Sequence, residues 1–184
     1  MKSKQITLSF VTSRKKKFEE AKRILDIPLR LINLDLPEIQ AVEVDRVVRA
    51  KALLAWEQTK KPCLVEDTGL YLKALNGFPG ALGKWVEKTM GWDGFLNILK
   101  SVKDREAYAK CTICFYDGKK YHLFSGRVIG KISRNLKGDA GFGWDVIFTP
   151  KGDRRTFSEM TMEEKNKISH RGRAFRKLAR HFEK

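Results

Sequence analysis

The chain has 184 residues, of which 42% are hydrophobic and 33% are charged. These values suit one globular domain over residues 1–184 with a sizeable core, and they exclude a disordered chain. No apolar run approaches the length of a membrane-spanning helix, so we expect no membrane association. The 38 lysines and arginines outnumber the 22 aspartates and glutamates, which gives a formal net charge of +16. Such a field attracts anions, whether nucleic acid, nucleotides or an acidic surface.

Residues 1–4 are basic, but residues 5–13 alternate like a strand and lack the apolar block and cleavage site of a signal peptide. A cytoplasmic protein is therefore expected. The chain has three cysteines, Cys63, Cys111 and Cys114. Cys111 and Cys114 form a lone C-x-x-C in a strand-like segment, where residues three apart point to opposite faces. This geometry predicts thiols that pack in the core and do not share a metal.

An amphipathic helix follows the first strand, and its apolar stripe includes Ala21 and Leu25. The charged residues between the apolar ones, Glu20 among them, are expected to face solvent. Thr12 and Ser13 precede the helix, and both are residue types that favour the N-cap position. We therefore expect one of them to cap this helix.

The first turn of that helix carries four cations, at residues 14–17. Free backbone N–H groups and the helix dipole already favour an anion there, so Arg14 and Lys17 predict a phosphate site. A second helix is expected over residues 43–60. Lys51 falls on its apolar face, where a lysine either extends its ammonium to solvent or meets an anion such as phosphate.

Two adjacent carboxylates follow the most apolar strand, at residues 63–65. Because charges are costly inside a doubly covered strand, Glu66 and Asp67 are expected at its carboxyl end, where open α/β sheets bind ligands. Glu38 follows the strand predicted at residues 29–34 in the same way. The alternative is an ordinary strand end with a turn, since Asp-Thr-Gly also favours turns.

The second half of the chain has a different pattern. Residues 107–116 and 121–132 alternate like strands, and Asp117-Gly118 between them is a strong hairpin signal. An antiparallel hairpin beside the βα pattern of the first half predicts a mixed sheet. A helix is expected over residues 92–101, with Phe95, Ile98 and Leu99 as its buried residues.

A glycine-rich loop at residues 138–145 contains two aromatic residues, Phe142 and Trp144. An aromatic ring between glycines can stack on a nucleobase, which contributes about 1–3 kcal/mol per base. The alternative for each ring is core filling, and we expect one of the two to fill the core.

Two helix starts can be located near the C-terminus. Thr161 and Glu164 form a capping box, and Ser169 is placed to cap the last helix. His170 and Arg171 occupy the first turn of that helix, where cations oppose the dipole. A ligand would explain this placement, and ordinary surface positions are the alternative.

In this order, the segments resemble the inosine triphosphate pyrophosphatase family over nearly the whole chain. The motifs that carry the resemblance are Phe10-Val11-Thr12-Ser13 with Lys17 and Glu20, Leu36-Pro37-Glu38, Val65 to Leu70, Gly77-Phe78-Pro79-Gly80 with Lys84-Trp85, Phe142 to Asp145, Glu164-Lys165-Asn166 and Ser169-His170-Arg171. The resemblance implies an α/β fold with a long curved mixed β-sheet flanked by helices, in two lobes with a central active-site cleft. It also implies a homodimer, dependence on Mg²⁺, and attack of water on the α-phosphorus of a deaminated purine nucleoside triphosphate.

The resemblance also implies roles for individual residues. Asp67 is the catalytic carboxylate and a metal ligand, and Glu38 is its metal partner; Glu66 has a weaker claim because adjacent strand residues point to opposite faces. The substrate-binding residues would be Thr12, Arg14, Lys17, Lys51, Thr68, Lys84, Phe142, Trp144, Asp145, Lys165, His170 and Arg171. Within this set, Thr12, Lys17, Lys51 and Lys165 would bind the triphosphate and Phe142 would stack on the base. Trp144, Asp145, His170 and Arg171 would shape and read the base, and Lys84 would close the cleft edge.

The sequence departs from the family pattern at Arg14, where asparagine is usual, and at Lys16, where a small residue is common. Arginine only donates hydrogen bonds, so the triphosphate geometry is affected more than the reaction class. Two alternatives stay open: a pyrophosphatase for other modified nucleotides, such as pyrimidines, and a non-catalytic nucleic-acid binder suggested by the net charge. The clustered carboxylates count against nucleic acid, because they repel phosphates.

Overall fold

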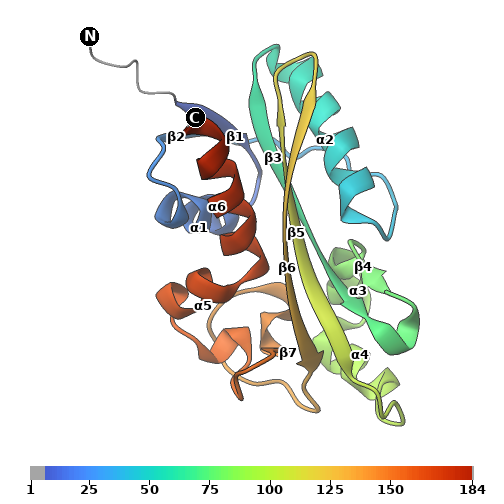
Figure 1. Cartoon of the computed structure of the whole chain (residues 1–184). Coiled ribbons are helices and arrows are strands. Elements are labelled where there is room, and N and C mark those ends of the chain that lie inside the picture. Colours follow the sequence, from blue (N-terminus) through green and yellow to red (C-terminus); the bar gives the residue numbers. More distant parts are fainter. Residues whose placement is uncertain (1–6, 184) are drawn as a thin grey trace.

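The computed structural model describes residues 7–183, and in that range it is a seven-stranded mixed β-sheet with helices on both faces (Figure 1). The strands are β1 (Leu8–Val11), β2 (Leu29–Ile32), β3 (Cys63–Leu72), β4 (Pro79–Gly80), β5 (Glu106–Tyr116), β6 (Tyr121–Ile132) and β7 (Phe148–Pro150). The helices are α1 (Lys15–Ile24), α2 (Val44–Thr59), α3 (Gly83–Thr89), α4 (Gly91–Ile98), α5 (Met162–Ile168) and α6 (His170–Phe182). Three 3₁₀ turns complete the set: η1 (Lys73–Leu75), η2 (Gly143–Val146) and η3 (Phe157–Glu159). The basic N-terminal residues and the first two positions of the predicted first strand lie outside the described residues.

The main sheet has the strand order β2-β1-β3-β5-β6-β7, and β4 pairs with β3. β1 is parallel to both β2 and β3, whereas all other pairs are antiparallel. The predicted mixed sheet is thus confirmed, as is the hairpin, which joins β5 to β6 through a turn in which Asp117 Oδ1 accepts two backbone N–H groups at 2.8 Å. None of the described helices is long and apolar enough to cross a membrane.

The prediction that Glu66 and Asp67 end a strand is wrong. β3 runs for ten residues, and the two carboxylates lie in its interior, because β5 pairs with it along the whole length and places Thr112 opposite Asp67. The open edge arises from the other neighbour. β1 pairs with β3 at Leu64 and ends one residue later, at Val11, so the carboxylates begin where the parallel strand stops. The open edge expected for a ligand is therefore present, and it exists because β1 ends while β3 continues.

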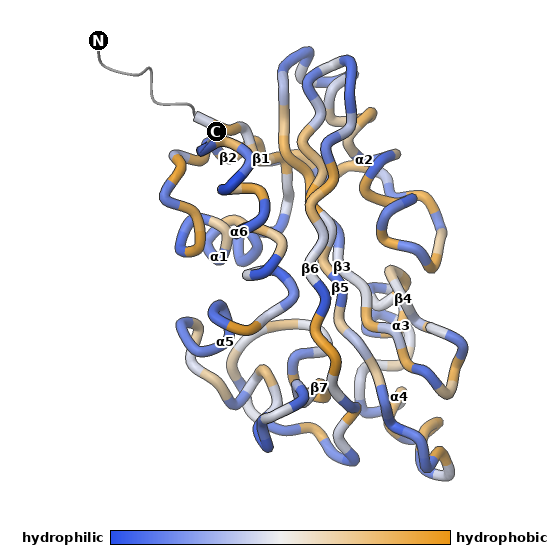
Figure 2. Tube along the Cα trace, in the orientation of Figure 1, coloured by the Kyte–Doolittle hydropathy of each residue, from blue (hydrophilic) through white to orange (hydrophobic). Residues whose placement is uncertain are grey.

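The upper part of the sheet buries both faces, which explains its continuous apolar runs. Leu64 and Cys111 pack with residues of α1 and α6, whereas Val65 and Cys114 pack with residues of α2 on the other face. Figure 1 shows α1 and α6 on one side of the strands and α2 on the other, and in Figure 2 these strand segments are largely hydrophobic. All three cysteines are buried and free, which confirms their prediction as packing residues.

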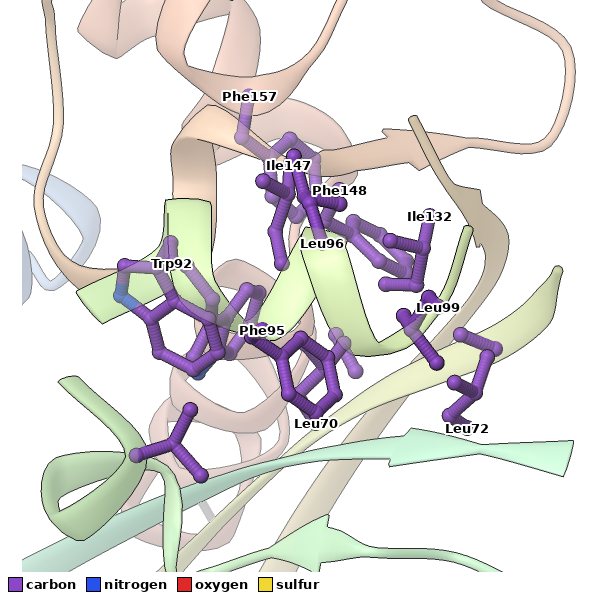
Figure 3. Packing of buried hydrophobic residues seen from close by; sticks show 14 of the residues in the cluster. Leu70, Leu72, Trp92, Phe95, Leu96, Leu99, Ile132, Ile147, Phe148 and Phe157 are labelled. Atoms are coloured by element: carbon purple, nitrogen blue, oxygen red, sulfur yellow. The ribbon is translucent and has the colours of Figure 1, made fainter. Parts of the chain in front are cut away.

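A separate core fills the lower lobe, between the far ends of β3 and β5 and helices α3 and α4 (Figure 3). The expected burial of Ile98 is wrong, because that side chain is 58% exposed. The inner face of the helix follows the spacing i, i+3, i+4, i+7 and consists of Trp92, Phe95, Leu96 and Leu99. Trp144 belongs to this core, so it is the ring of the glycine-rich loop that fills the interior.

The N-caps of α5 and α6 are the residues predicted from the sequence, whereas the N-cap of α1 is not. Thr161 and Ser169 each accept a hydrogen bond from the backbone N–H three residues on, as predicted. The prediction that Thr12 or Ser13 caps α1 is wrong, since the N-cap is Arg14, with no side-chain cap. Thr12 instead accepts the Arg14 N–H at 3.2 Å, in the turn before the helix. The first turn of α1 thus keeps free donors beside its cations.

Candidate active site

A cleft opens beside the carboxylates of β3, where the two lobes meet. Its wider part is lined by Asp67 and Thr68 of β3 and by residues of α3, η2 and the start of α6. A narrower branch is lined by Thr12, residues of the 34–38 loop and Lys51 of α2. The two parts share Arg14, Lys17, Glu38 and Lys84 and therefore form one continuous hollow.

Asp67 is a buried carboxylate of this cleft that lacks part of its hydrogen bonding. Its side chain is nearly buried, and its Oδ2 atom has no hydrogen-bond partner among the described residues. Burial raises the pKa of Asp67 to about 6; the nearby Lys17 and Lys51 oppose the increase, and Glu38 and Glu66 add to it. A carboxyl group with a pKa near 6 is ionised at neutral pH and is basic enough to accept a proton from water.

Glu38 reaches the cleft from the loop after β2 and is held by cations. Lys51 Nζ of α2 lies 2.5 Å from Glu38 Oε1, and Lys84 Nζ of α3 lies 4.0 Å from Oε2. Burial alone would raise the pKa of Glu38, but Lys51, together with Lys17 and Lys84, outweighs burial and lowers the pKa. Glu38 is thus charged, and it faces the same cleft as Asp67.

These two carboxylates are the candidate metal ligands. No group of three or more histidine, cysteine, aspartate or glutamate side chains gathers anywhere in residues 7–183 in a way that would hold a metal ion. A site with only two protein carboxylates fits Mg²⁺, which commonly takes one or two carboxylates and completes its shell with water and substrate phosphates. The unpartnered Oδ2 of Asp67 supports the fit, because a buried polar atom without a partner is costly.

Glu66 belongs to a different arrangement, on the opposite face of β3. Arg171 of α6 binds it with two hydrogen bonds, at 2.8 and 3.0 Å, and Lys17 Nζ lies 3.1 Å from it. Burial would raise the pKa of Glu66, but Arg171 and Lys17 outweigh it and lower the pKa. Adjacent residues of a strand were expected to point to opposite faces, and Glu66 and Asp67 do so. Glu66 binds cations on one face of β3, while Asp67 faces the cleft on the other.

The expectation that Glu20 faces solvent is wrong, since it is 1% exposed. Glu20 is bound by Arg171 and by Lys165, the latter at 2.9 Å. Lys165 also donates to Asp145 at 2.7 Å, and Asp145 accepts the Phe142 N–H at 3.0 Å. This buried chain of ion pairs joins α1, α5 and α6 to the loop that carries Phe142. Its balanced charge is what permits ions so far from water.

Phe142 is a partly exposed ring in the wider part of the cleft. Lys165 Nζ and Arg171 Cζ lie 5.1 and 5.3 Å from its centroid, within cation–π range, and so hold the ring in place. Two buried ring nitrogens of residues that line the same part of the cleft have no partner among the described residues: Nε1 of Trp92 and Nδ1 of His170. Burial, with Arg171 and Lys165, lowers the pKa of His170, so its ring is neutral.

Residues 8–181 match the sequence pattern of the Ham1 family. The chain belongs to the Ham1 family. Among its relatives, a dITP/XTP pyrophosphatase of Thermococcus kodakarensis is 44% identical over 175 residues, covering 94% of this chain and 95% of the relative. The Inosine triphosphate pyrophosphatase 1 of Trypanosoma cruzi is 40% identical over 179 residues, covering 95% and 91%.

Solved structures agree. A HAM1 protein from Coxiella burnetii superposes with a TM-score of 0.81 at 28% identity, covering 95% of this chain and 98% of that one. The Staphylococcus aureus Ham1 protein gives a TM-score of 0.79 at 26% identity, with the same coverage. The resemblance proposed from sequence motifs is therefore confirmed, together with the long mixed sheet.

The Ham1 chain brings most of the predicted residues to one cleft. Those that line it are Thr12, Arg14, Lys17, Glu38, Lys51, Asp67, Thr68, Lys84, Phe142, Trp144, Asp145, His170 and Arg171. Lys165 does not line the cleft; it lies behind Phe142, 2% exposed, between two carboxylates. Direct contact of Lys165 with a triphosphate would require breaking these pairs. Its role as a phosphate ligand stays a prediction.

Sequence reasoning missed five lining residues, Leu34, Asp35, Gly83, Glu87 and Trp92, and the structural role of Glu20. For Glu20 a signal existed: Lys17 and Glu20 are three apart on the inward face of α1, and two opposite charges there indicate a buried ion pair network. Lys16 also has a contact, from its Nζ to the Gly141 carbonyl at 3.2 Å, which spans from α1 to the glycine-rich loop. No local pattern predicted that contact.

Proposed function

We propose that this Ham1 protein hydrolyses deaminated purine nucleoside triphosphates (ITP, dITP and XTP) to the nucleoside monophosphate and pyrophosphate, and so removes them from the nucleotide pool. One observation carries the proposal: a single cleft has an aromatic ring at one end and an unpartnered buried carboxylate beside a cation-lined branch. A purine triphosphate has the matching parts in the same order. The printed names of the relatives support the same substrate class.

The phosphates would occupy the branch lined by Arg14, Lys17, Lys51 and Lys84. These cations neutralise the charge that grows on the leaving pyrophosphate when the bond between the α-phosphorus and its bridging oxygen breaks. The free backbone donors at the start of α1 add to this anion site. Thr12, in the turn before the helix, lines the same branch.

Asp67 would take the proton of the attacking water, since it is buried, ionised at neutral pH and directed into the cleft. Asp67 and Glu38 would hold Mg²⁺ in the proposed enzyme. When bound, that ion would polarise the phosphoryl oxygens and offset their charge. Lys51 keeps Glu38 ionised and thereby ready to serve as a ligand.

The base would stack on Phe142, and selection for a 6-oxo group would come from donors at that end. The Trp92 indole N–H can only donate a hydrogen bond, and it has no partner among the described residues. An oxygen at carbon six of the purine accepts such a bond, whereas the amino group of adenine cannot. A buried donor left unpaired by the wrong base supports strong discrimination.

The decisive experiment measures pyrophosphate and nucleoside monophosphate released from ITP, dITP, XTP, ATP and dUTP with Mg²⁺. We expect release from the first three and little from ATP or dUTP. Asp67→Asn should abolish the activity, and Asp93→Asn, a matched change of an exposed residue on α4, should retain it. No release above background, preference for dUTP, or full activity in Asp67→Asn would each refute the proposal.

Three further properties are part of the proposal and rest on family membership and composition. The enzyme would be a homodimer, with twice the chain mass by sedimentation equilibrium; a monomer at micromolar concentration would contradict this.

The enzyme would act in the cytoplasm, where cell fractionation should place it. Residues 1–184 would form a single domain of two lobes, which predicts one cooperative unfolding transition and not two.

A further inference from the structure

Helix α6 carries a stripe of cations on its solvent-facing side. Arg173, Arg176, Lys177 and Arg180 are all exposed and follow the spacing i, i+3, i+4, i+7 of one helix face. The helix contains no aspartate or glutamate. Within residues 7–183, none of the four forms an ion pair with a carboxylate. In Figure 2 hydrophobic and hydrophilic residues both occur along α6, and its Ala174, Phe175 and Leu178 pack in the core.

The stripe borders a groove of about 920 Å³ between α6, the end of α1 and β6. The groove lining contains these four cations, against only two carboxylates, Asp26 and Glu183. Arg127 of β6 contributes its backbone to the lining, where its carbonyl accepts a hydrogen bond from Arg173, and its guanidinium lies over the Tyr108 ring at 3.7 Å. It shares no lining residue with the active-site cleft. The groove is therefore a second, separate electropositive surface.

Three of the four side chains are held in position by backbone carbonyls. Arg173 and Arg176 donate to carbonyl groups at the end of α5, at 2.8–3.1 Å, and Lys177 donates to the Ser125 carbonyl at 2.7 Å. Because a guanidinium has five N–H donors, each arginine keeps donors for a ligand. Fixed side chains lose less conformational entropy when they bind.

The crowding of these cations is electrostatically unfavourable in the free protein. Burial lowers the pKa of Arg176, and the neighbouring Arg173 and Arg180 lower it further. Like charges three and four residues apart also destabilise a helix. A bound polyanion would relieve this repulsion, whereas solvent exposure alone gives no reason to place four cations on one face.

We propose that the α6 stripe binds the phosphate backbone of a nucleic-acid duplex without sequence preference. The stripe from Arg173 to Arg180 spans about 10 Å at 1.5 Å per residue, which matches about three phosphates at 3.4 Å per nucleotide along one strand. No large exposed hydrophobic residue lies on α6. Its exposed ring, His181, packs against the rings of His122, Phe124 and Phe182. The stripe therefore lacks a free stacking ring, as in single-strand binders, and the apolar anchors of membrane-surface helices.

The structure also removes the objection that carboxylates would repel nucleic acid. The carboxylates of the chemistry, Glu38 and Asp67, face the cleft and not the groove. Nucleic acid binding is then an additional function that leaves the cleft free, and it does not depend on the proposed hydrolysis. The +16 charge is partly explained by this surface.

The test measures binding of a fluorescein-labelled 20-base-pair DNA duplex by anisotropy, from 50 to 300 mM salt. Three phosphate contacts predict a slope of log K against log salt of about −3. Lys177→Gln with Arg180→Gln should weaken binding at least tenfold at 50 mM salt and reduce the slope by about 2. The control, Lys119→Gln with Lys120→Gln in the β5–β6 turn, removes the same charge from another exposed site and should stay within twofold.

Further measurements distinguish duplex binding at the stripe from binding in the cleft and from membrane binding. Excess duplex should leave nucleotide hydrolysis unchanged, and the stripe variant should keep wild-type hydrolysis and thermal stability. Absence of duplex binding, equal weakening by both double variants, or inhibition of hydrolysis by duplex would overturn the proposal. So would binding to vesicles containing 30% phosphatidylserine with no binding to duplex, which would identify an anionic membrane as the partner.

Discussion

Arg171 of α6 holds Glu66 of β3 through two parallel hydrogen bonds, Nε to Oε2 at 2.8 Å and Nη2 to Oε1 at 3.0 Å. Both side chains are at least 98% buried. The bidentate geometry fixes the start of α6 against the middle of the central strand. It also holds the Arg171 guanidinium beside the Phe142 ring, so one pair links the central strand to the glycine-rich loop.

Removing Arg171 should strongly destabilise the fold, because Glu20 and Glu66 would stay buried without their cation. We expect Arg171→Leu to lower the free energy of unfolding by about 3–5 kcal/mol, the usual loss when one partner of a buried ion pair is removed. Urea denaturation at pH 7 measures this. Arg154→Leu is the control at an exposed arginine, where a change within about 0.5 kcal/mol is expected. Equal effects of the two substitutions would contradict a structural role for the pair.

Replacing Asp67 should separate activity from stability. Each pH unit by which a pKa is displaced corresponds to about 1.4 kcal/mol, so the rise to about 6 means that the ionised carboxylate destabilises the folded protein at pH 7.5 by up to about 3 kcal/mol. Asp67→Asn should therefore raise Tm at pH 7.5 while kcat falls about 100-fold or more. Calorimetry of the variant and the wild type measures this change. A lowered Tm in the variant would show that the ionised Asp67 carboxylate does not destabilise the folded protein.

The stability of the protein should fall steeply in acid. The lowered pKa values of Glu20 and Glu66 contribute stability that is complete above 4.5 and is lost as the pH falls below it. The raised pKa of Asp67 acts in the opposite sense, since its contribution is complete below 3.8 and is lost as the pH rises through about 6. The lowered pKa of His170 opposes that loss, because its contribution is complete above 6.5 and is lost as the pH falls. Urea titrations from pH 3 to pH 8 should therefore show one steep limb, below about pH 4.5. Glu66→Gln should flatten the acid limb, and an unchanged limb in that variant would disprove the assignment.

Lys51 should tune the reactivity of Asp67. Its charge helps to lower the pKa of Asp67 against the effect of burial, so Lys51→Met should move that pKa upward. In the free enzyme, the acid limb of kcat/KM against pH reports this group. We expect the limb to shift to higher pH in Lys51→Met and to stay in place in Lys22→Met, a change at an exposed residue of α1. A shift to lower pH would reverse the sign of the proposed interaction.

Phe142 should contribute to substrate binding through stacking. A base–aromatic stack contributes about 1–3 kcal/mol, so Phe142→Leu should raise the KM for ITP by about fivefold or more. The matched control is Phe78→Leu, at a ring that is 40% exposed and outside the cleft. If both substitutions left KM unchanged, the base would have to bind elsewhere.

Much of the fold follows from local sequence. The β5–β6 hairpin follows from Asp117-Gly118, and the starts of α5 and α6 follow from Thr161 and Ser169, because these interactions join residues only two or three apart. The two-sided burial of β3 follows from its unbroken apolar start. The cleft carboxylates Glu38 and Asp67 were recognisable as charges directly after apolar runs.

The partners of the charged residues were decided only by the tertiary structure. Glu66 meets Arg171 across 105 positions of sequence, and Lys165 meets Glu20 across 145. Helical periodicity placed Glu20 in solvent, because a pattern of residue types cannot distinguish an exposed charge from one buried with its counter-ion. That distinction depends on whether remote segments bring a compensating charge, which is a property of packing. The separation of the catalytic cleft from the cationic face of α6 arises in the same way, from the folding of a uniformly basic chain around a few buried carboxylates.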